Sequence, residues 1–445
     1  MWPVTRLAAE LASEQDRLAA FTVKGDLSVR ATFDVSYRSL PAGTARLYRL
    51  LSLIPGPDFG SELAAATAGL SPEQASELLD ELTAASLLAE TGQQRFRFHD
   101  LVKLHARDQV TAAERPAAVA SAVGWYLAGA VAADIVVIPG RWRLNPMYEQ
   151  ARAAPPAFGT RQDALRWLES GLRHLIAAIQ TAHDEGLHEQ AWQLCEAMWG
   201  LFTYRKYFRY WIQAHRLGIE SALACGNRRA EARMRVQLGL ADLNLAQPDQ
   251  AREEFARALL LDRQEGHRIG EATALENLGL TDLVLGRPED AIGSFVQARD
   301  IFAQSGVPRG VMGMTRHIGE AHRDAARFEQ AIQHLTEARR LATALPDPYN
   351  EARCLTSLGE TYLKAGEPGR ALGPLGDAAE LMTSLGGEYE QARISAMLGD
   401  ALLLLDQPEG AREHLTSALV IYSRAGAPEA DDVRRKLGGL PADPG

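Results

Sequence analysis

Lysine is nearly absent from this chain, and cysteine is scarce. Five lysines stand against 42 arginines, and the net charge is −10. This acidic balance argues against a general nucleic-acid binder or a protein that binds anionic membranes. The three cysteines, Cys195, Cys225 and Cys354, lie far apart and in no metal-ligand spacing. They predict a reduced, cytoplasmic protein with no disulfide framework, no zinc site and no other cofactor.

Long apolar runs and phosphate-binding loops are missing as well. The N-terminal segment has no apolar stretch typical of a signal peptide. The longest apolar run, "YLAGAVAADIVVI", is interpreted as too short to cross a bilayer, so no membrane contact is expected. No GxxxxGK[ST] motif occurs, and Lys24 has no glycine loop before it. The chain alone therefore cannot hydrolyse ATP by a P-loop mechanism.

The second half of the chain contains five internal repeats of forty residues. Glycines recur at this spacing, each preceded by Leu or Ile and followed twelve positions later by alanine: Gly239, Gly279, Gly319, Gly359 and Gly399, with Ala251, Ala291, Ala331, Ala371 and Ala411. Proline stands nine residues after four of these glycines, at positions 248, 288, 368 and 408. Identical spacing at several positions predicts a repeat architecture, which buries a continuous core by stacking.

Each repeat has the pattern of a helical hairpin. Proline with a neighbouring acidic residue is typical of a helix start. Small Gly and Ala residues mark where two helices approach closely. Large residues are expected to fill the space beside them: Phe255, Phe295, Leu335, Leu375 and Leu415. Residues 225–430 thus resemble tetratricopeptide repeats, and "DDVRRKLGGL" is interpreted as a terminal cap. Residues 160–224 are expected to form less regular hairpins of the same kind.

The first half has the pattern of a winged-helix domain. Helices are expected over 27–38, 41–53, 60–68 and 72–86, and Ser71 with Gln74 forms a capping-box pattern. The alternating stretch "SLLAETGQQRFRFHD" predicts a β-hairpin, after which a helix resumes. The candidate recognition helix carries Glu73, Glu77, Asp80 and Glu81. Acidic groups facing phosphates oppose binding, so DNA binding is not expected.

The order "FDVSYRSLP…ARLYRLLSLIPGPDF…SPEQASELLDELTAASLL…RFRFHDLVKLHARD", followed by repeats, resembles the C-terminal half of bacterial NB-ARC/TPR signalling ATPases of the STAND class. "FHD" at 98–100 matches that family's Met-His-Asp motif, with Phe98 in place of methionine. The resemblance implies that His99 and Asp100 are the remains of an ADP sensor. It also implies a natural truncated relative, a segment of a longer protein, or a chain that works with a separately encoded ATPase.

Simpler structural roles compete with this interpretation. Asp100 would cap the helix beginning "LVKLHARD", with His99 at a strand end, and this role is favoured in the absence of a P-loop. His105 and Asp108 are interpreted as a surface pair on that helix. The Pro-rich stretch 136–159 is expected to be a linker or a loop lying on the repeats.

Two clusters are candidate binding sites for a ligand or partner. The first is aromatic and basic and includes Trp199, Tyr204, Arg205, Tyr207, Arg209 and Trp211; core packing is the alternative and is favoured. The second lies on first-helix positions expected to line a concave groove and includes Arg316, His317, Glu320, Arg353 and Arg393. The Lys and Asn residues of a carboxylate clamp are missing there. The mixed charges suit a polar peptide, and a solvated groove with internal ion pairs is the alternative.

The sequence therefore predicts a mainly α protein in which a winged-helix domain with a small β-hairpin precedes a TPR-like α-solenoid. The expected parts are a helical lead (1–26), a winged helix (27–112), a helical connector with a Pro-rich linker (113–159), irregular hairpins (160–224) and the solenoid with its cap (225–445). No nucleophile or metal motif indicates catalysis. A non-catalytic module that binds a protein, peptide or small effector is favoured. A biosynthetic enzyme using the pocket near 192–216 and a DNA-binding regulator are the alternatives.

Overall fold

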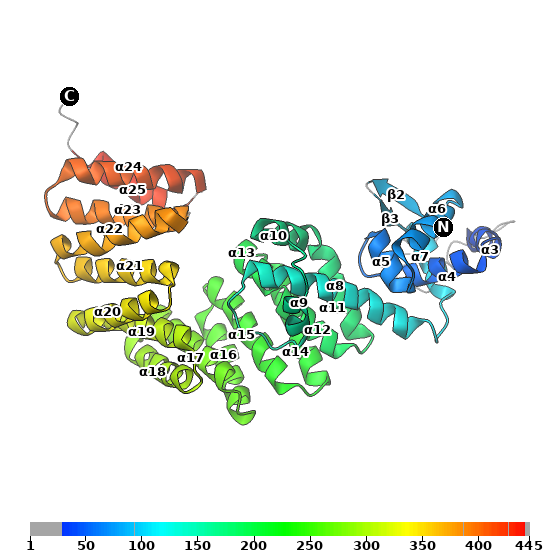
Figure 1. Cartoon of the computed structure of the whole chain (residues 1–445), viewed down its shortest axis with the longest axis horizontal. Helices are drawn as coiled ribbons and strands as arrows, with labels where there is room; N and C mark the ends of the chain where they lie inside the picture. Colours follow the sequence, from blue (N-terminus) through cyan, green and yellow to red (C-terminus); the bar gives the residue numbers. More distant parts are fainter. Residues whose placement is uncertain (1–28, 93, 386, 426, 441–445) are drawn as a thin grey trace, which may run out of the picture. The chain divides into compact units, whose positions relative to one another are not determined.

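The structure of the chain is a computed structural model that describes residues 29–440 except 93, 386 and 426. The expected helical lead, 1–26, lies outside these residues. The chain divides into two compact units, Met1–Ala241 and Asp242–Gly445, and the division falls within helix α15 (Arg228–Asn244). The architecture is mainly helical with one small sheet (Figure 1), as the sequence predicts.

The first unit begins with the winged-helix domain. Its elements are α3 (Val29–Arg38), α4 (Ala42–Leu51), β1 (Phe59–Gly60), α5 (Ser61–Ala68), α6 (Pro72–Ala84), β2 (Ala89–Gly92) and β3 (Arg95–Arg97). The sheet is antiparallel in the order β1-β3-β2. Ser71 and Gln74 form the expected capping box, in which Gln74 N donates to Ser71 Oγ at 3.2 Å. Strand β1 was not predicted because its two residues are too few to form a pattern.

The winged helix is followed by α7 (Asp100–Asp108), the long helix α8 (Arg115–Val137) and α9 (Met147–Ala153). By length and composition, α8 could cross a membrane. The interpretation that its apolar run is too short was therefore wrong, because the helix starts upstream at Arg115. Half of its most apolar window is buried, and α8 packs against α5, α9, α10, α11, α12 and α13. These contacts are those of a core helix in a helical array.

The remaining helices of the first unit lie in the range where irregular hairpins are expected, 160–224. They are α10 (Arg161–Ser170), α11 (Leu172–Asp184), α12 (His188–Ala197), α13 (Trp199–Arg205) and α14 (Phe208–Ala224), followed by α15. Helix α12 packs against α8, α11 and α14. Leu175, Leu194 and Trp211 are completely or almost completely buried there. One continuous core joins these residues to Leu47 and Leu79 of the winged helix.

The second unit is a regular stack of helical hairpins (Figure 1). Its helices are α16 (Pro248–Gln264), α17 (Arg268–Val284), α18 (Pro288–Gln304), α19 (Pro308–Asp324), α20 (Phe328–Ala344), α21 (Pro348–Lys364), α22 (Pro368–Leu385), α23 (Glu388–Leu404), α24 (Pro408–Ala425) and α25 (Glu429–Gly438). Each helix packs against the next one along the chain.

The repeated glycines are positions of close approach between helices. A Cβ added to Gly279 would lie 2.5 Å from Phe295 Cε1, and one added to Gly319 would lie 2.7 Å from Leu335 Cγ. Such distances are too short for real side chains, so glycine lets the paired helices meet here. The expected pairing of small and large residues is confirmed at these sites.

Candidate functional site

His99 and Asp100 lie at the start of α7, after the wing strand β3. His99 occupies the N-cap position and Asp100 is the first helical residue. The prediction that Asp100 caps this helix was therefore wrong by one residue. Both residues are exposed, and the His99 carbonyl accepts a hydrogen bond from Lys103 N at 2.9 Å. The role of this pair in sensing a nucleotide stays a prediction.

His105 was expected on the surface beside Asp108, and this is wrong. The imidazole is fully buried, with Nδ1 2.9 Å from the Tyr48 hydroxyl and Nε2 3.0 Å from Asp34 Oδ1. The hydrogen bond with His105 lowers the pKa of Asp34. Asp108 instead forms an ion pair with Arg30 at 3.5 Å. The histidine thus joins α3 to α7 inside the winged helix.

The aromatic cluster near α13 and α14 combines core and surface residues. Trp211 is 1 % exposed, and its Nε1 donates to Gln237 O at 2.8 Å. Trp199 contacts it edge-on, with ring centroids 5.4 Å apart.

The other predicted residues of this cluster lie outside its core. Arg205 Nε contacts Glu169 Oε2 at 3.2 Å, and the Tyr207 hydroxyl donates to the same carboxylate. Tyr204 and Arg209 are exposed, and Arg161 lies over the Tyr204 ring. Burial of Trp211 agrees with core packing, and the ligand-binding role of the exposed residues stays a prediction.

A buried ionic cluster holds the Pro-rich loop between α8 and α9 in place. This cluster was not predicted from the sequence. Asp134 Oδ2 accepts hydrogen bonds from Arg141 Nη2, Arg143 Nε and the Tyr148 hydroxyl, each at 2.9 Å. The Glu196 carboxylate accepts from the backbone nitrogens of Leu144 and Asn145. The stretch is therefore an ordered loop lying on the helical array.

This loop also covers Arg233, which stands six residues before the first repeat glycine. The Arg233 guanidinium stacks on the Trp142 ring at 4.1 Å. Its Nε lies 3.4 Å from Glu196 Oε1, and its Nη2 donates to Trp142 O at 3.4 Å. Burial lowers the pKa of Arg233 to about 10. The Arg233 guanidinium thus contacts an aromatic ring, a backbone carbonyl and a carboxylate of this same chain.

In the second unit, the first helices of successive hairpins, α17, α19, α21 and α23, form a surface that we call the first-helix face. On α19, Arg316 Nη1 lies 2.5 Å from Glu320 Oε1, and His317 Nδ1 lies 3.0 Å from Glu320 Oε2. Ser357 Oγ of α21 donates to Glu320 at 2.7 Å. Although burial opposes ionisation, Arg316 and His317 hold the pKa of Glu320 well below its usual range.

Arg353 and Arg393 differ from Arg316, because no ion pair or hydrogen bond is found for either guanidinium within the described residues. Arg353 lies on α21, 6.0 Å from the Tyr349 ring, and burial and the neighbouring Arg316 lower its pKa. Arg393 lies on α23 and is exposed. Tyr349 and Tyr389 are 44 % and 43 % exposed. All five predicted groove residues lie on helices of the first-helix face, and the guanidiniums of Arg353 and Arg393 make no close ion pair there within the described residues.

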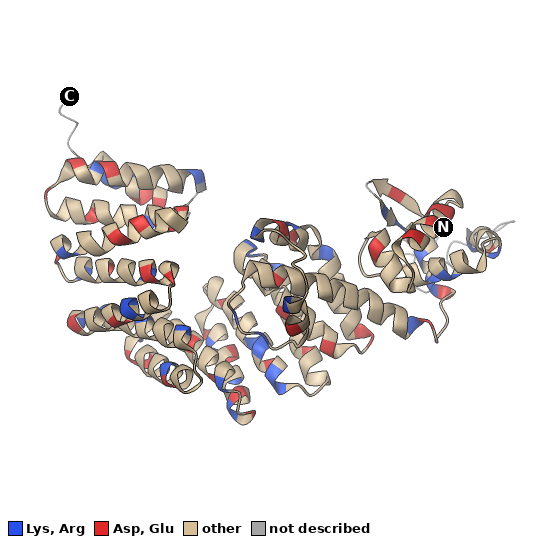
Figure 2. Ribbon diagram, viewed as in Figure 1, with Lys and Arg blue, Asp and Glu red and all other residues tan. Residues whose placement is uncertain are grey.

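Two other kinds of site are less supported. Among the described residues, no group of three or more His, Cys, Asp and Glu side chains could hold a metal ion. On α6, the candidate recognition helix, Glu73, Glu77, Asp80 and Glu81 are all exposed (Figure 2). This negative surface is consistent with the expectation that the winged helix does not bind DNA, which stays a prediction.

Comparison with known proteins supports the repeat assignment. A tetratricopeptide-repeat family profile matches residues 230–304 and 311–384. The fold is also similar to a STAND protein with a tetratricopeptide repeat sensor from Pyrococcus horikoshii, at a TM-score of 0.51 and 14 % identity. That match covers 97 % of this chain and 65 % of the other. At this identity the likeness concerns the fold alone.

Two curated relatives share sequence with this chain. Regulatory protein AfsR of Streptomyces griseus is 33 % identical over 267 residues, which cover 59 % of this chain and 27 % of that protein. AfsR of Streptomyces coelicolor is 32 % identical over 268 residues, again 27 % of its length. The match thus spans about a quarter of each regulator. The chain contains a tetratricopeptide-repeat region and is related to a segment of the AfsR regulators.

Proposed function

We propose that this chain is a non-catalytic interaction module of a STAND-type signalling or transcription-regulatory protein, and that its first-helix face binds an extended acidic segment of a partner protein. The observation that carries this proposal is the pair Arg353 and Arg393, for which no ion pair or hydrogen bond is found within the described part of the chain, although Glu320 acts on Arg353 through space. The relation to AfsR supports a regulatory setting, and the repeats support binding through stacked helices.

The chemistry of the occupant is inferred from Arg233. This residue stands at the same repeat position as Arg353 and Arg393, six before the glycine. There the guanidinium is covered by a carboxylate, a carbonyl and a tryptophan ring. A partner segment that offers carboxylates and an aromatic ring would give the guanidiniums of Arg353 and Arg393 the close contacts that Arg233 already has. Charge-assisted hydrogen bonds of this kind are among the stronger polar contacts.

The spacing of the two arginines suggests a pattern in the partner. They lie on α21 and α23, which contact each other, and packed helices are roughly 8–10 Å apart. An extended chain rises about 3.3 Å per residue. Carboxylates three residues apart in an extended segment would therefore match Arg353 and Arg393, and an aromatic side chain between them would reach Tyr349.

The test uses fluorescein-labelled ten-residue peptides that are identical except for their charged positions. One has Glu residues three apart, a second has the two Glu residues adjacent, and a third has Gln in both places. Fluorescence anisotropy is measured at low and physiological salt, because exposed charge pairs are screened. We expect the first peptide to bind at least tenfold more tightly than the Gln peptide. The double variant Arg353→Glu/Arg393→Glu should abolish that preference.

A matched control reverses two exposed arginines on second helices, Arg340 on α20 and Arg370 on α22. This Arg340→Glu/Arg370→Glu variant has the same change in net charge and should bind the acidic peptide as the native chain does. The proposal fails if both double variants lose affinity equally, or if the Gln peptide binds as tightly as the Glu peptide.

A further inference from the structure

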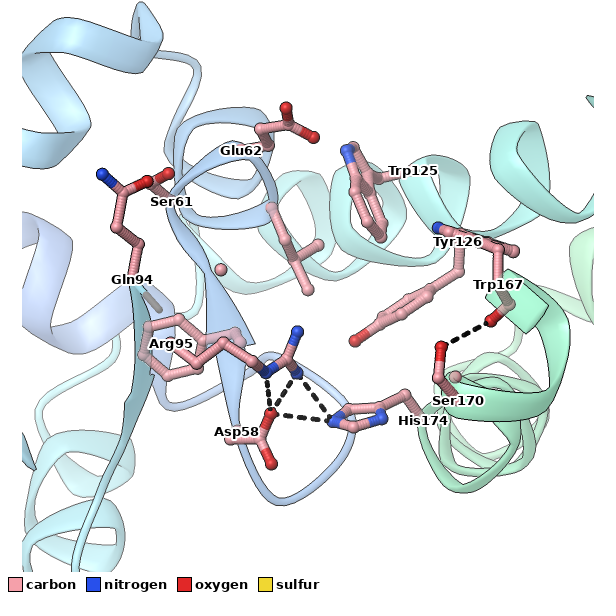
Figure 3. A pocket seen from close by; sticks show the side chains of 14 residues that line it. Asp58, Ser61, Glu62, Gln94, Arg95, Trp125, Tyr126, Trp167, Ser170 and His174 are labelled. Atoms are coloured by element: carbon pink, nitrogen blue, oxygen red, sulfur yellow. Dashed lines mark hydrogen bonds and ion pairs between the residues drawn. The ribbon is translucent and has the colours of Figure 1, made fainter. Parts of the chain in front are cut away.

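A cavity of about 600 Å³ lies within the first unit, between the winged helix and the helical array (Figure 3). From the winged helix, it is lined by the turn around Asp58, the start of α5 and Arg95 of β3. From the array, it is lined by Trp125 and Tyr126 of α8, Trp167 and Ser170 of α10, and His174 of α11. This volume falls within the range typical of small-molecule sites, about 300–1,000 Å³. The cavity is separate from the first-helix face.

One wall of the cavity is aromatic. The Trp125 and Trp167 rings have centroids 6.3 Å apart at 49°, and Trp125 contacts Tyr126 edge-on at 5.2 Å. Both tryptophans are only partly buried, although an indole ring is among the largest apolar groups a core can bury. Exposed indole faces inside a cavity suit a flat, apolar ring system.

The opposite wall is polar and nearly balanced in charge. Arg95 pairs with the Asp58 carboxylate, and His174 Nε2 lies 3.3 Å from both Asp58 Oδ1 and Arg95 Nη2 (Figure 3). Burial lowers the pKa of His174, which favours the neutral form of its ring. Glu62 is exposed and lies across the cavity from these groups (Figure 3).

The start of α5, on the side of Glu62, offers hydrogen-bond donors to the cavity. Its N-cap residue is Gly60, and no side chain caps the helix. The first backbone N–H groups of a helix have no partner within the helix, and Ser61, Glu62 and Leu63 all line the cavity. A ligand that accepts hydrogen bonds here would satisfy them.

We propose that this cavity binds a small, uncharged, planar heteroaromatic molecule. The indole wall takes its ring face, and Arg95, His174 and the α5 N–H groups bind polar groups around its rim. An anionic ligand would face the carboxylates of Asp58 and Glu62, and a cationic one would face Arg95 and the positive end of α5. Such a molecule contacts both parts of the first unit, so its binding would stabilise their association.

Three indoles with short 3-substituents of different charge test the proposal. Indole-3-acetamide is uncharged, indole-3-acetate is anionic and tryptamine is cationic. Binding to the whole chain is measured by saturation-transfer NMR and isothermal titration calorimetry. We expect the amide to bind saturably and at least tenfold more tightly than the two charged compounds. No saturable binding of the amide up to millimolar concentration, or tighter binding of either charged compound, would overturn the proposal.

Two variants locate the binding in the cavity. Ser61→Phe fills it from the first residue of α5, and Ser170→Phe fills it from α10, where Ser170 is exposed. Each should weaken amide binding at least tenfold. Ser39→Phe makes the same change at an exposed residue after α3 and should leave binding unchanged. Far-ultraviolet circular dichroism confirms that each variant is folded. Unchanged amide binding in both folded cavity variants would show that the compound binds elsewhere.

Discussion

Two glycines on one helix, α19, allow the close packing of the repeats to be measured. A Cβ at Gly319 would lie 2.7 Å from Leu335 Cγ and 3.2 Å from the backbone oxygen of Ala331 in α20. A Cβ at Gly313 would have no heavy atom within 4 Å. The substitutions Gly319→Ala and Gly313→Ala therefore add the same methyl group, one against a neighbouring helix and one in open space.

The magnitudes follow from two opposing effects. Alanine in place of a helical glycine stabilises by roughly 1 kcal/mol, and this gain applies to both variants. Forcing a methyl group into a packed interface costs about 1–3 kcal/mol, and this cost applies to Gly319→Ala alone. Gly313→Ala should therefore be more stable than the native chain. The difference between the two variants isolates the packing cost, so we expect Gly319→Ala to be less stable than Gly313→Ala by about 1–3 kcal/mol.

The assay is urea denaturation followed by circular dichroism, with the free energy of unfolding taken from the transition of each variant. The same Gly319→Ala change is repeated in a Leu335→Ala background, where the facing side chain is truncated and the cost should shrink. A difference below about 0.5 kcal/mol between the two glycine variants, within the usual scatter of surface substitutions, would refute the close-approach explanation.

Two buried or half-buried carboxylates of the first unit give further predictions. Arg49 donates to both oxygens of Glu114, at 2.6 and 3.1 Å, and holds the pKa of Glu114 at about 2. Glu114→Gln should therefore cost on the order of 2–3 kcal/mol at neutral pH. Because the pKa of Glu114 is depressed in the folded state, the stability difference between the native chain and Glu114→Gln should narrow as pH falls from about 4.5 towards 2. A difference in urea midpoints that does not change with pH would show that the Arg49–Glu114 pair is not its cause. Asp134→Ala removes the acceptor shared by Arg141 and Arg143 and should cost about 3–5 kcal/mol. Asp163→Ala, an exposed carboxylate at the start of α10, is its control, and equal losses in urea denaturation would count against the buried cluster.

The elements that sequence reasoning predicted best are those whose signals are local or repeated. The capping box at Ser71 and the prolines opening α16, α18, α22 and α24 mark helix starts within the chain itself. The glycine periodicity fixes which helices pair, because only a residue without a side chain fits at Gly279 or Gly319. The groove residues Arg316, Arg353 and Arg393 could be placed on one face for the same reason.

The features that were missed depend on contacts between distant residues. Asp134 lies on α8 and Glu196 on α12, with a loop and helices α9, α10 and α11 between them. No local sequence pattern shows that both carboxylates bind the segment around Arg141. His105 was placed on the surface because its partners, Tyr48 and Asp34, lie more than fifty positions away. The cavity beside Trp125 has contributions from four separate stretches of chain. Such sites require a folded chain to become visible.

Helix α8 leaves the ribosome before most of the helices that cover it. It is apolar enough to pass for a membrane segment, yet most of the helices that cover it, α10, α11 and α12, come later in the chain. Until the ribosome has produced residues up to Ala197, the apolar surface of α8 has only part of its final cover. Apolar surface that is uncovered during folding favours aggregation in general, and the later emergence of α10, α11 and α12 leaves such a surface on α8. The speed at which α10, α11 and α12 emerge and dock therefore determines how long this apolar surface stays uncovered.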